Sequence, residues 1–498
     1  MTYALLASVF LIASCGLVYE LIAGTLASYL LGDSVMQFST VIGTYLFAMG
    51  IGSYLSKFVA RGLIARFVQV ELLVGLIGGA SASVLFVTFS MGMAFRPVLY
   101  ATVLAVGTLV GLEIPLLLRI LRDRIEFRDL VAQVLTLDYI GALAASLAFP
   151  LVLVPKVGLV RSAFLFGLLN AAVALWSTFI FAATLGPARI LRTQCIVVVL
   201  LLVAGVAGAD RITELAEGAM YSDEIILARS SPYQRIVVTR WKDDIRLYLN
   251  NHLQFSSRDE YRYHEALVHP GLSSLPLPRR VLILGGGDGL AAREVLRYPA
   301  VESITLVDLD PEMTRLASTH DMFLRFNERS LLSPRLRIVN EDAFKFLEST
   351  RESFDFVIVD LPDPNNYSLG KLYTNVFYRR LAHVLSENGV VAVQSTSPLF
   401  ARRSFWCVAE TIRSAGLLIA PYHVYVPSFG EWGFVLASRR PYRPAATLPA
   451  GLKFLDSKTL PGLFDFPADM AAVGVEVNRL NSQILVQYYD AEWHAIAP

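Results

Sequence analysis

The sequence predicts a multi-helix transmembrane bundle followed by a doubly wound α/β domain that begins with a small β-subdomain. Hydrophobic residues make up 55% of the 498 residues and charged residues only 17%, which is more apolar than an ordinary soluble protein. The apolar residues are concentrated in residues 1–208, whereas residues 209–498 have a mixed composition. In this second part, short apolar strands alternate with helical segments from residue 281 onward.

The first part contains seven apolar runs that are long enough for transmembrane helices. They cover roughly residues 3–31, 36–60, 65–90, 97–121, 130–154, 162–185 and 190–208. We therefore expect residues 1–208 to form a multi-pass domain in contact with membrane lipid. Ionised groups at membrane depth are costly and usually face a bundle interior or an aqueous cavity. Four carboxylates lie within the runs: Glu20, Glu71, Glu113 and Asp138.

Basic residues are concentrated in alternate gaps between the runs, around Lys57 to Arg66 and around Arg119 to Arg128. The positive-inside rule would place both gaps in the cytoplasm. Seven full crossings would then put the C-terminal half outside. The segment with Pro150 is the first candidate for a re-entrant or flat-lying helix, because its removal restores a cytoplasmic C-terminal half.

Residues 209–275 are expected to form a connector and a small β-subdomain with a helix over 259–268. The segment "YQRIVVTRWKDDIRLYLN" contains two alternating runs around a turn. Residues 276–440 are expected to form a Rossmann-like domain with strands at 281–284, 303–309, 336–339, 354–360 and 391–396. Such apolar strands predict a parallel sheet covered on both faces, with ligands bound beyond the strands' carboxyl ends. Residues 441–498 carry no assignable motif, and we expect a helical tail packed on the domain.

Glycines and acids follow four of these strands. The first strand leads into "GGGDG", where Gly285 and Gly287 let a ligand approach the backbone and Asp288 adds a carboxylate where phosphates usually bind. Asp308 lies at the end of the second strand, about 20 residues on, where an acid can bind ribose hydroxyls. The third strand is followed by Asp342 and Ala343, and the fourth ends with Asp360 and is followed by Asp363.

So many carboxylates around one cleft would repel a phosphate-rich dinucleotide and would suit a cationic ligand. This pattern indicates a sulfonium-type adenosyl cosubstrate and a polyamine. The net charge of +1 gives no reason to expect nucleic-acid binding. The three cysteines lie far apart, and His264 and His269 have no obvious third ligand, so we expect neither a disulfide framework nor a metal site.

The motifs of the second half resemble the spermidine synthase (polyamine aminopropyltransferase) family, which has a class I methyltransferase-like fold. The matching segments lie in the family's order over residues 221–438: "YQRIV", "LQFSSRDEYRYHE", "GGGDG", "VDLD", "EDAFKFL", and "DLPDP" followed by "VFY". The apolar half, which includes "CGLVYEL", resembles the membrane-fused branch of the same family.

The resemblance implies that decarboxylated S-adenosylmethionine donates an aminopropyl group to an amine such as putrescine, giving spermidine and methylthioadenosine. Asp360 would accept the proton, and Asp288 would bind the donor's ammonium group. The donor site would comprise Gln234, Gly285, Gly287, Asp288, Asp308, Asp342 and Ala343. The amine site would comprise Gln254, Tyr263, His264, Asp288, Asp360 and Asp363.

The chain also departs from the family's pattern. Leu290 replaces a glycine, the loop after "DLPDP" is one residue longer, and "VPSFGEWGF" stands where the family has an amine-contacting tyrosine. The acceptor is therefore less constrained than the donor. Family members are commonly dimers or tetramers, so a homo-oligomer is an open expectation.

Two other functions remain open. One is a methyltransferase that uses intact S-adenosylmethionine, although Asp288 would repel the carboxylate of that donor. The other is a membrane polyamine transporter or sensor, which would use the carboxylates of the apolar half. Because the decarboxylated donor is made in the cytosol, we expect a cell-membrane protein whose catalytic half lies in the cytoplasm.

Overall fold

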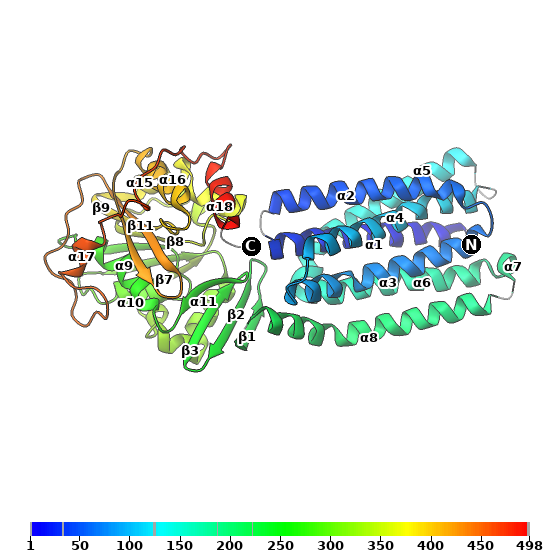
Figure 1. Ribbon diagram of the computed structural model, residues 1–498, viewed down its shortest axis with the longest axis horizontal. Helices are drawn as coiled ribbons and strands as arrows, with labels where there is room; N and C mark the ends of the chain where they lie inside the picture. The colour runs from blue at the N-terminus through cyan, green and yellow to red at the C-terminus, as the bar shows by residue number, and fades with distance from the viewer. Residues whose placement is uncertain (1, 32–33, 123–125, 187, 222, 496–498) are drawn as a thin grey trace. The chain divides into compact units, whose positions relative to one another are not determined.

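The computed structural model describes residues 2–31, 34–122, 126–186, 188–221 and 223–495. The chain divides into two compact units, Met1–Glu224 and Ile225–Pro498. The first unit consists of long helices joined by short connections (Figure 1). They are α1 (Thr2–Leu31), α2 (Ser34–Leu55), α3 (Leu63–Ser90), α4 (Phe95–Leu121), α5 (Phe127–Ala148), α6 (Leu159–Ile180) and α8 (Arg189–Met220), with the short η1 (Ser56–Phe58), η2 (Phe149–Val157) and α7 (Ala182–Leu185).

The long helices correspond to the predicted apolar runs. Within the described ranges, seven helical segments are long and apolar enough to cross a membrane, with α5 and η2 counted as one. Helix α8 continues to Met220, so the polar stretch after residue 208 extends the last apolar helix. Glycines bring α2 and α4 into close contact, because a Cβ at Gly52 would lie 2.0 Å from the carbonyl oxygen of Thr108.

The second unit begins with a four-stranded sheet in the order β1-β2-β3-β4. Its strands are β1 (Glu224–Ser230), β2 (Arg235–Trp241), β3 (Asp244–Leu249) and β4 (His252–Ser256). The expected turn at "KDD" joins β2 and β3, which pair antiparallel. Helix α9 (Glu260–Leu272) follows and leads to the large sheet.

The large sheet has seven strands in the order β10-β11-β9-β8-β5-β6-β7. They are β5 (Arg280–Gly285), β6 (Ser303–Asp308), β7 (Leu336–Asn340), β8 (Phe354–Asp360), β9 (Leu385–Gln394), β10 (Leu418–Val426) and β11 (Gly430–Ser438). Strands β5 to β9 are parallel, and β11 and β10 extend the sheet antiparallel. The chain builds outward from β5 to β7 and then returns to the other side of β5 with β8. This reversal is the position where open α/β sheets bind ligands.

Both faces of the large sheet are covered, as the continuous apolar strands predict. Alternate residues of β5 belong to two different cores, with Val281 and Ile283 in one and Leu282 and Leu284 in the other. The covering helices are α10 (Leu290–Val295), α11 (Pro311–Thr319) and α12 (Asp321–Phe326) in the first core, and α13 (Ala343–Ser349), α15 (Asn375–Val384) and α16 (Arg402–Arg413) in the second. The predicted methyltransferase-like α/β fold is confirmed.

The C-terminal segment is less helical than the sequence led us to expect. After residue 441 the described chain forms only α17 (Thr459–Gly462) and α18 (Ile484–His494), and the remainder is irregular. Leu455, Met470 and Leu485 are nevertheless buried in the second unit. Single buried side chains, and not one amphipathic helical face, attach the segment to the domain, so its sequence lacks a clear helical period.

Candidate active site

The glycine turn after β5 is shaped by its contact with β8. Gly285 pairs with Asp360 across the two strands, and its φ of +85° is a conformation that favours glycine. A Cβ on Gly285 would lie 2.0 Å from the carbonyl oxygen of Asp360. The same carbonyl accepts a 3.2 Å hydrogen bond from the amide of Gly286. The turn and Asp360 therefore meet where the strand order reverses.

Asp308 ends β6 and binds the backbone of the glycine turn. Its Oδ2 accepts a 3.1 Å hydrogen bond from the amide of Gly287, and its Oδ1 accepts one of 2.8 Å from the amide of Asp310. A Cβ on Gly287 would lie only 2.5 Å from Oδ2. Burial raises the pKa of Asp308 to about 6.

Gln234 lies near this strand end but contacts a different acid. Its Nε2 donates a 2.8 Å hydrogen bond to Oδ2 of Asp310, which also accepts one from Ser231. Asp310 was not among the predicted site residues, although it is the second acid of the "VDLD" motif. It links the small sheet to the carboxyl end of β6.

Asp360 is the last residue of β8, and Asp288 lies in the turn that follows the neighbouring strand β5. Oδ1 of Asp288 accepts a hydrogen bond from the amide of Leu290, and burial raises the pKa of its carboxyl. Oδ1 of Asp360 accepts a 2.7 Å hydrogen bond from the hydroxyl of Tyr263. Burial raises the pKa of Asp360 to about 6, against the opposing effect of the nearby His264.

His264 is buried, and only one nitrogen of its ring, Nδ1, makes hydrogen-bonding contacts in the described structure. Its Nδ1 lies 2.8 Å from the carbonyl oxygen and 2.9 Å from Oε2 of Glu260. Burial lowers the pKa of His264, but the hydrogen bond and charge of Glu260, with the charges of Asp288 and Asp360, raise it above its ordinary value. In the described structure, Nε2 makes no hydrogen bond, so it remains available to a ligand.

Asp342 has a different environment from the other strand-end acids. It caps α13 by accepting a 2.8 Å hydrogen bond from the amide of Phe344, and it forms a 2.6 Å ion pair with Lys371. Burial raises the pKa of Asp342, but the hydrogen bond and charge of Lys371, with backbone hydrogen bonds from Phe344 and Lys345, lower it, and the net shift is downward. Ala343 is buried at the first position of the same helix.

Asp363 follows β8 and is surrounded by side-chain donors. Its Oδ1 accepts a 3.3 Å hydrogen bond from Gln394, and its Oδ2 accepts hydrogen bonds from Thr396 and Tyr489. Neither Thr396 nor Tyr489 was predicted. The tail that carries Tyr489 had no family motif to draw attention to it.

The structure brings together most, but not all, of the predicted residues. Gln254 lies on β4, half-buried, and its amide donates only to the carbonyl oxygen of His252 among the residues described. Across the same described ranges, four of the strand-end acids form no ion pair with lysine or arginine: Asp288, Asp308, Asp360 and Asp363. No cluster of potential metal ligands is found in the described residues. The strand ends thus carry a negative charge that a cation can compensate.

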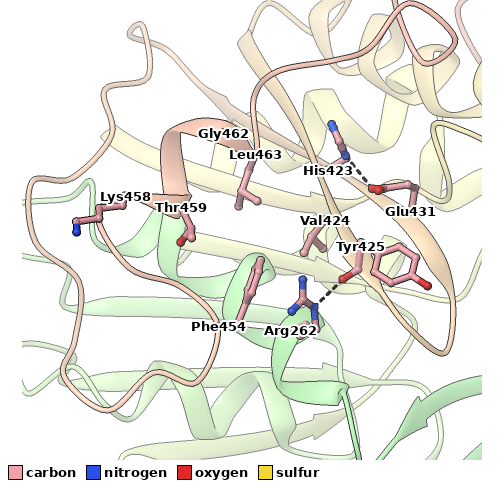
Figure 2. A pocket seen from close by; sticks show the side chains of 10 residues that line it. All are labelled: Arg262, His423, Val424, Tyr425, Glu431, Phe454, Lys458, Thr459, Gly462 and Leu463. Carbon is pink, nitrogen blue, oxygen red and sulfur yellow. Dashed lines mark hydrogen bonds and ion pairs between the residues drawn. The ribbon is translucent and has the colours of Figure 1, made fainter.

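A separate surface pocket of about 310 Å³ lies beside α9, β10 and α17 (Figure 2). Three of its polar side chains are paired within the lining, since Arg262 donates to the carbonyl oxygen of Tyr425 and His423 contacts Glu431. None of the predicted site residues lines it. We therefore place the candidate active site at the strand ends and not in this pocket.

Comparison with known proteins identifies the class. Residues 260–447 match the spermine/spermidine synthase domain. The chain is 54% identical over its whole length to a polyamine aminopropyltransferase of Leptospira interrogans, whose whole length is also covered. It is 56% identical to polyamine aminopropyltransferase 2 of Ralstonia nicotianae, over 99% of this chain and 98% of the relative. The chain belongs to the polyamine aminopropyltransferase family.

Solved structures similar to part of this chain include a spermidine synthase in complex with the transition-state analogue AdoDATO. It is 26% identical, covers 49% of this chain and 86% of its own, and has a TM-score of 0.46. The spermidine synthase of Thermotoga maritima is 25% identical, with coverage of 49% and 85% and a TM-score of 0.45. The match to the curated relatives extends over nearly the whole chain and so includes the helical unit.

Proposed function

We propose that this chain transfers the aminopropyl group of decarboxylated S-adenosylmethionine to an amine such as putrescine, giving spermidine and methylthioadenosine. The observation that carries the proposal is the group of strand-end carboxylates that have no lysine or arginine partner in the described structure. The chain that carries them shares more than half of its residues with polyamine aminopropyltransferases over nearly its full length. Such a group suits a sulfonium donor and a polyamine.

The donor occupies the turn after β5 and the ends of β6 and β7. Asp308 binds the ribose hydroxyls, and Asp342 with Ala343 borders the adenine. Gln234 acts through Asp310, to which it donates a hydrogen bond. Asp288 pairs with the aminopropyl ammonium group, and Gly285 and Gly287 leave room for the donor at the backbone.

The reaction needs an uncharged amine next to the donor carbon. Asp360 takes the proton from the acceptor nitrogen, which attacks the carbon bonded to sulfur. The C–N bond forms as the C–S bond breaks, and its electron pair stays on sulfur to give the neutral thioether. Tyr263 orients Asp360 through its 2.7 Å hydrogen bond, and His264 and Asp363 bind the acceptor amine beside it. Gln254 is the weakest member of this assignment because its amide faces its own strand.

Purified full-length protein in detergent tests the assignment. Incubation with the decarboxylated donor and a panel of amines, followed by mass spectrometry, is expected to show aminopropyl products and methylthioadenosine. The intact donor is expected to give no product, because its carboxylate is repelled by Asp288. Methyl transfer without aminopropyl transfer would overturn the proposal in favour of a methyltransferase.

We place the seven long helices in the cell membrane, with the second unit in the cytoplasm. Their length and apolar composition support this location. The decarboxylated donor is cationic and made in the cytosol, so the site that consumes it belongs on that side.

One observation favours a second candidate function, a membrane site for polyamines. Glu71 on α3 and Glu113 on α4 are buried, and each has a carboxyl oxygen with no hydrogen-bond partner in the described structure. The other oxygen of Glu71 accepts a hydrogen bond from Asn170. Polyamine uptake that survives Asp360→Asn and fails in Glu113→Gln would support this function, whereas uptake indifferent to both changes would remove it.

A further inference from the structure

The C-terminal helix α18 carries a tyrosine that reaches the strand-end acids. The hydroxyl of Tyr489 donates a 3.0 Å hydrogen bond to Oδ2 of Asp363, which lies 126 residues earlier in the chain. Oδ2 also accepts a 2.9 Å hydrogen bond from Thr396. Two donors therefore occupy Oδ2, while Oδ1 has only the longer, 3.3 Å contact from Gln394 and can still accept from a ligand.

Helix α18 is firmly attached to the domain that carries the strand ends. Glu492 accepts hydrogen bonds from the amides of Arg403 and Ser404 at the start of α16, where a carboxylate is favoured. Leu485, at the other end of α18, is fully buried. Contacts before and after Tyr489 in α18 thus fix its position, and the fold itself holds its hydroxyl against Asp363.

The second donor to Asp363 is held in a strained backbone conformation. Thr396 has a φ of +60°, which is unusual for a β-branched residue. Its carbonyl oxygen accepts a 2.7 Å hydrogen bond from the amide of Gly433 on β11. Conformations of this kind persist where the surrounding structure enforces them, and they are frequent at ligand sites. Both donors to Oδ2 are therefore placed by tertiary structure.

We propose that Tyr489 is a positioning residue of the acceptor-amine site, which holds Asp363 with Oδ1 directed toward the ammonium group of a primary amine. The proposal rests on the proposed function, because it assumes that Asp363 binds the acceptor. It assigns a role in substrate recognition to the C-terminal segment, which lies beyond the matched domain at residues 260–447. The hydrogen bonds from Thr396, Tyr489 and Gln394 also lower the pKa of Asp363 against the larger, raising effect of burial.

The substitution Tyr489→Phe tests this role. It removes the hydroxyl but keeps the ring, which packs against Trp493 at a centroid distance of 5.7 Å. Loss of a hydrogen bond to a charged group is expected to raise the KM for the acceptor roughly ten-fold. The KM for the donor should stay unchanged. The pH below which acceptor affinity is lost should move upward, because Asp363 loses a bond that favours its ionised form.

The matched control is Tyr488→Phe, on the same helix. Tyr488 packs under Arg403 through its ring, and its hydroxyl makes no hydrogen bond in the described structure, so the kinetics should not change. If the Tyr489→Phe variant keeps the acceptor KM and the transfer activity of the wild-type protein, this inference is overturned and the proposed function is not. Equal increases in both KM values would also overturn it, in favour of a purely structural role. Absence of aminopropyl transfer in the wild-type protein would instead overturn the proposed function.

Discussion

Asp360 combines two properties that a general base in this reaction requires. It lies at the central strand end beside the glycine turn, and burial raises the pKa of its carboxyl to about 6. Tyr263 binds one oxygen and leaves the other available for the amine. Burial weakens the ionised form, whereas His264 and the phenol support it.

This balance predicts the pH dependence of the reaction. Burial raises the pKa of Asp360 to about 6, and only the ionised carboxylate accepts a proton, so kcat should rise as the pH increases through about 6. Tyr263→Phe removes a hydrogen bond that lowers this pKa, and the rise should then occur at higher pH. Rate profiles at saturating donor and acceptor measure both shifts. A profile flat between pH 5 and 7 would argue against Asp360 as the base.

At the residue scale, the strand-end acids were predictable because parallel strands bring their carboxyl ends together. Asp308 and Asp360 lie where the register places them. The partner of each acid was not predictable in the same way. Asp342 meets Lys371 and Asp363 meets Tyr489, and these contacts join segments that no local pattern connects.

The loop between β5 and α10 shows how one element couples the backbone to the donor site. Gly287 donates its amide to Asp308 and leaves no room for a side chain on that side. Gly287→Ala would place Cβ 2.5 Å from Oδ2 of Asp308, so the acid or the loop must move.

We expect Gly287→Ala to raise the donor KM roughly ten-fold or more, because small displacements of binding groups are costly. Methylthioadenosine binding, measured by calorimetry, should weaken in parallel. The control is Gly474→Ala, where a new Cβ meets no atom within 4 Å and φ is not positive. Unchanged methylthioadenosine affinity in Gly287→Ala would separate this loop from the donor site.

Helices α9 and α10 are joined by a buried ionic network that also fixes His264. Arg293 binds both carboxylate oxygens of Glu260, at 3.0 and 2.9 Å, and Glu260 in turn binds His264. Burial would raise the pKa of Glu260, but His264 and Arg293 lower it to about 2. The network therefore keeps a charged carboxylate beneath the amine site.

Removing Arg293 should be strongly destabilising, because it leaves a buried charge with too little compensation. We expect Arg293→Met to lower the free energy of unfolding by about 3–5 kcal/mol. Thermal unfolding of the full chain in detergent measures the loss. Arg315→Met, which removes an exposed pair with Glu312, should have no measurable effect. Adding Glu260→Gln to Arg293→Met should restore part of the stability, and an equally unstable double variant would contradict this account.

At the element scale, the parallel strands and the long helices could be predicted from their continuous apolar runs, and the tail could not. The strands β5, β6, β7 and β8 lie within about one residue of the predicted ranges. The irregular segment between β11 and α18 is instead fixed by single long-range contacts, such as the buried Asn478, whose side chain donates to the carbonyl oxygens of Gly370 and Tyr373. Contacts of this kind leave no periodic signal.

At the scale of the whole molecule, composition separates the two units, but the side of the membrane depends on how many helices cross it. The basic gap around Arg122 is favoured in the cytoplasm. Three long apolar segments separate it from the second unit, and three crossings would place the two on opposite sides. The proposed cytoplasmic location of the second unit predicts an even number of crossings between them.

Cysteine labelling decides this question. The three natural cysteines are buried, so a cysteine introduced at an exposed site should react alone with an impermeant maleimide. Glu387→Cys, in the second unit, and Arg122→Cys, in the basic gap, replace exposed side chains. We expect both to be labelled only after the cells are permeabilised. That result would mean that one of the three segments does not cross, and the segment Phe127–Val157, with prolines at 150 and 155, is the one we expect. Labelling of Glu387→Cys in intact cells would place the active site outside the compartment that supplies its donor and would contradict the proposed orientation.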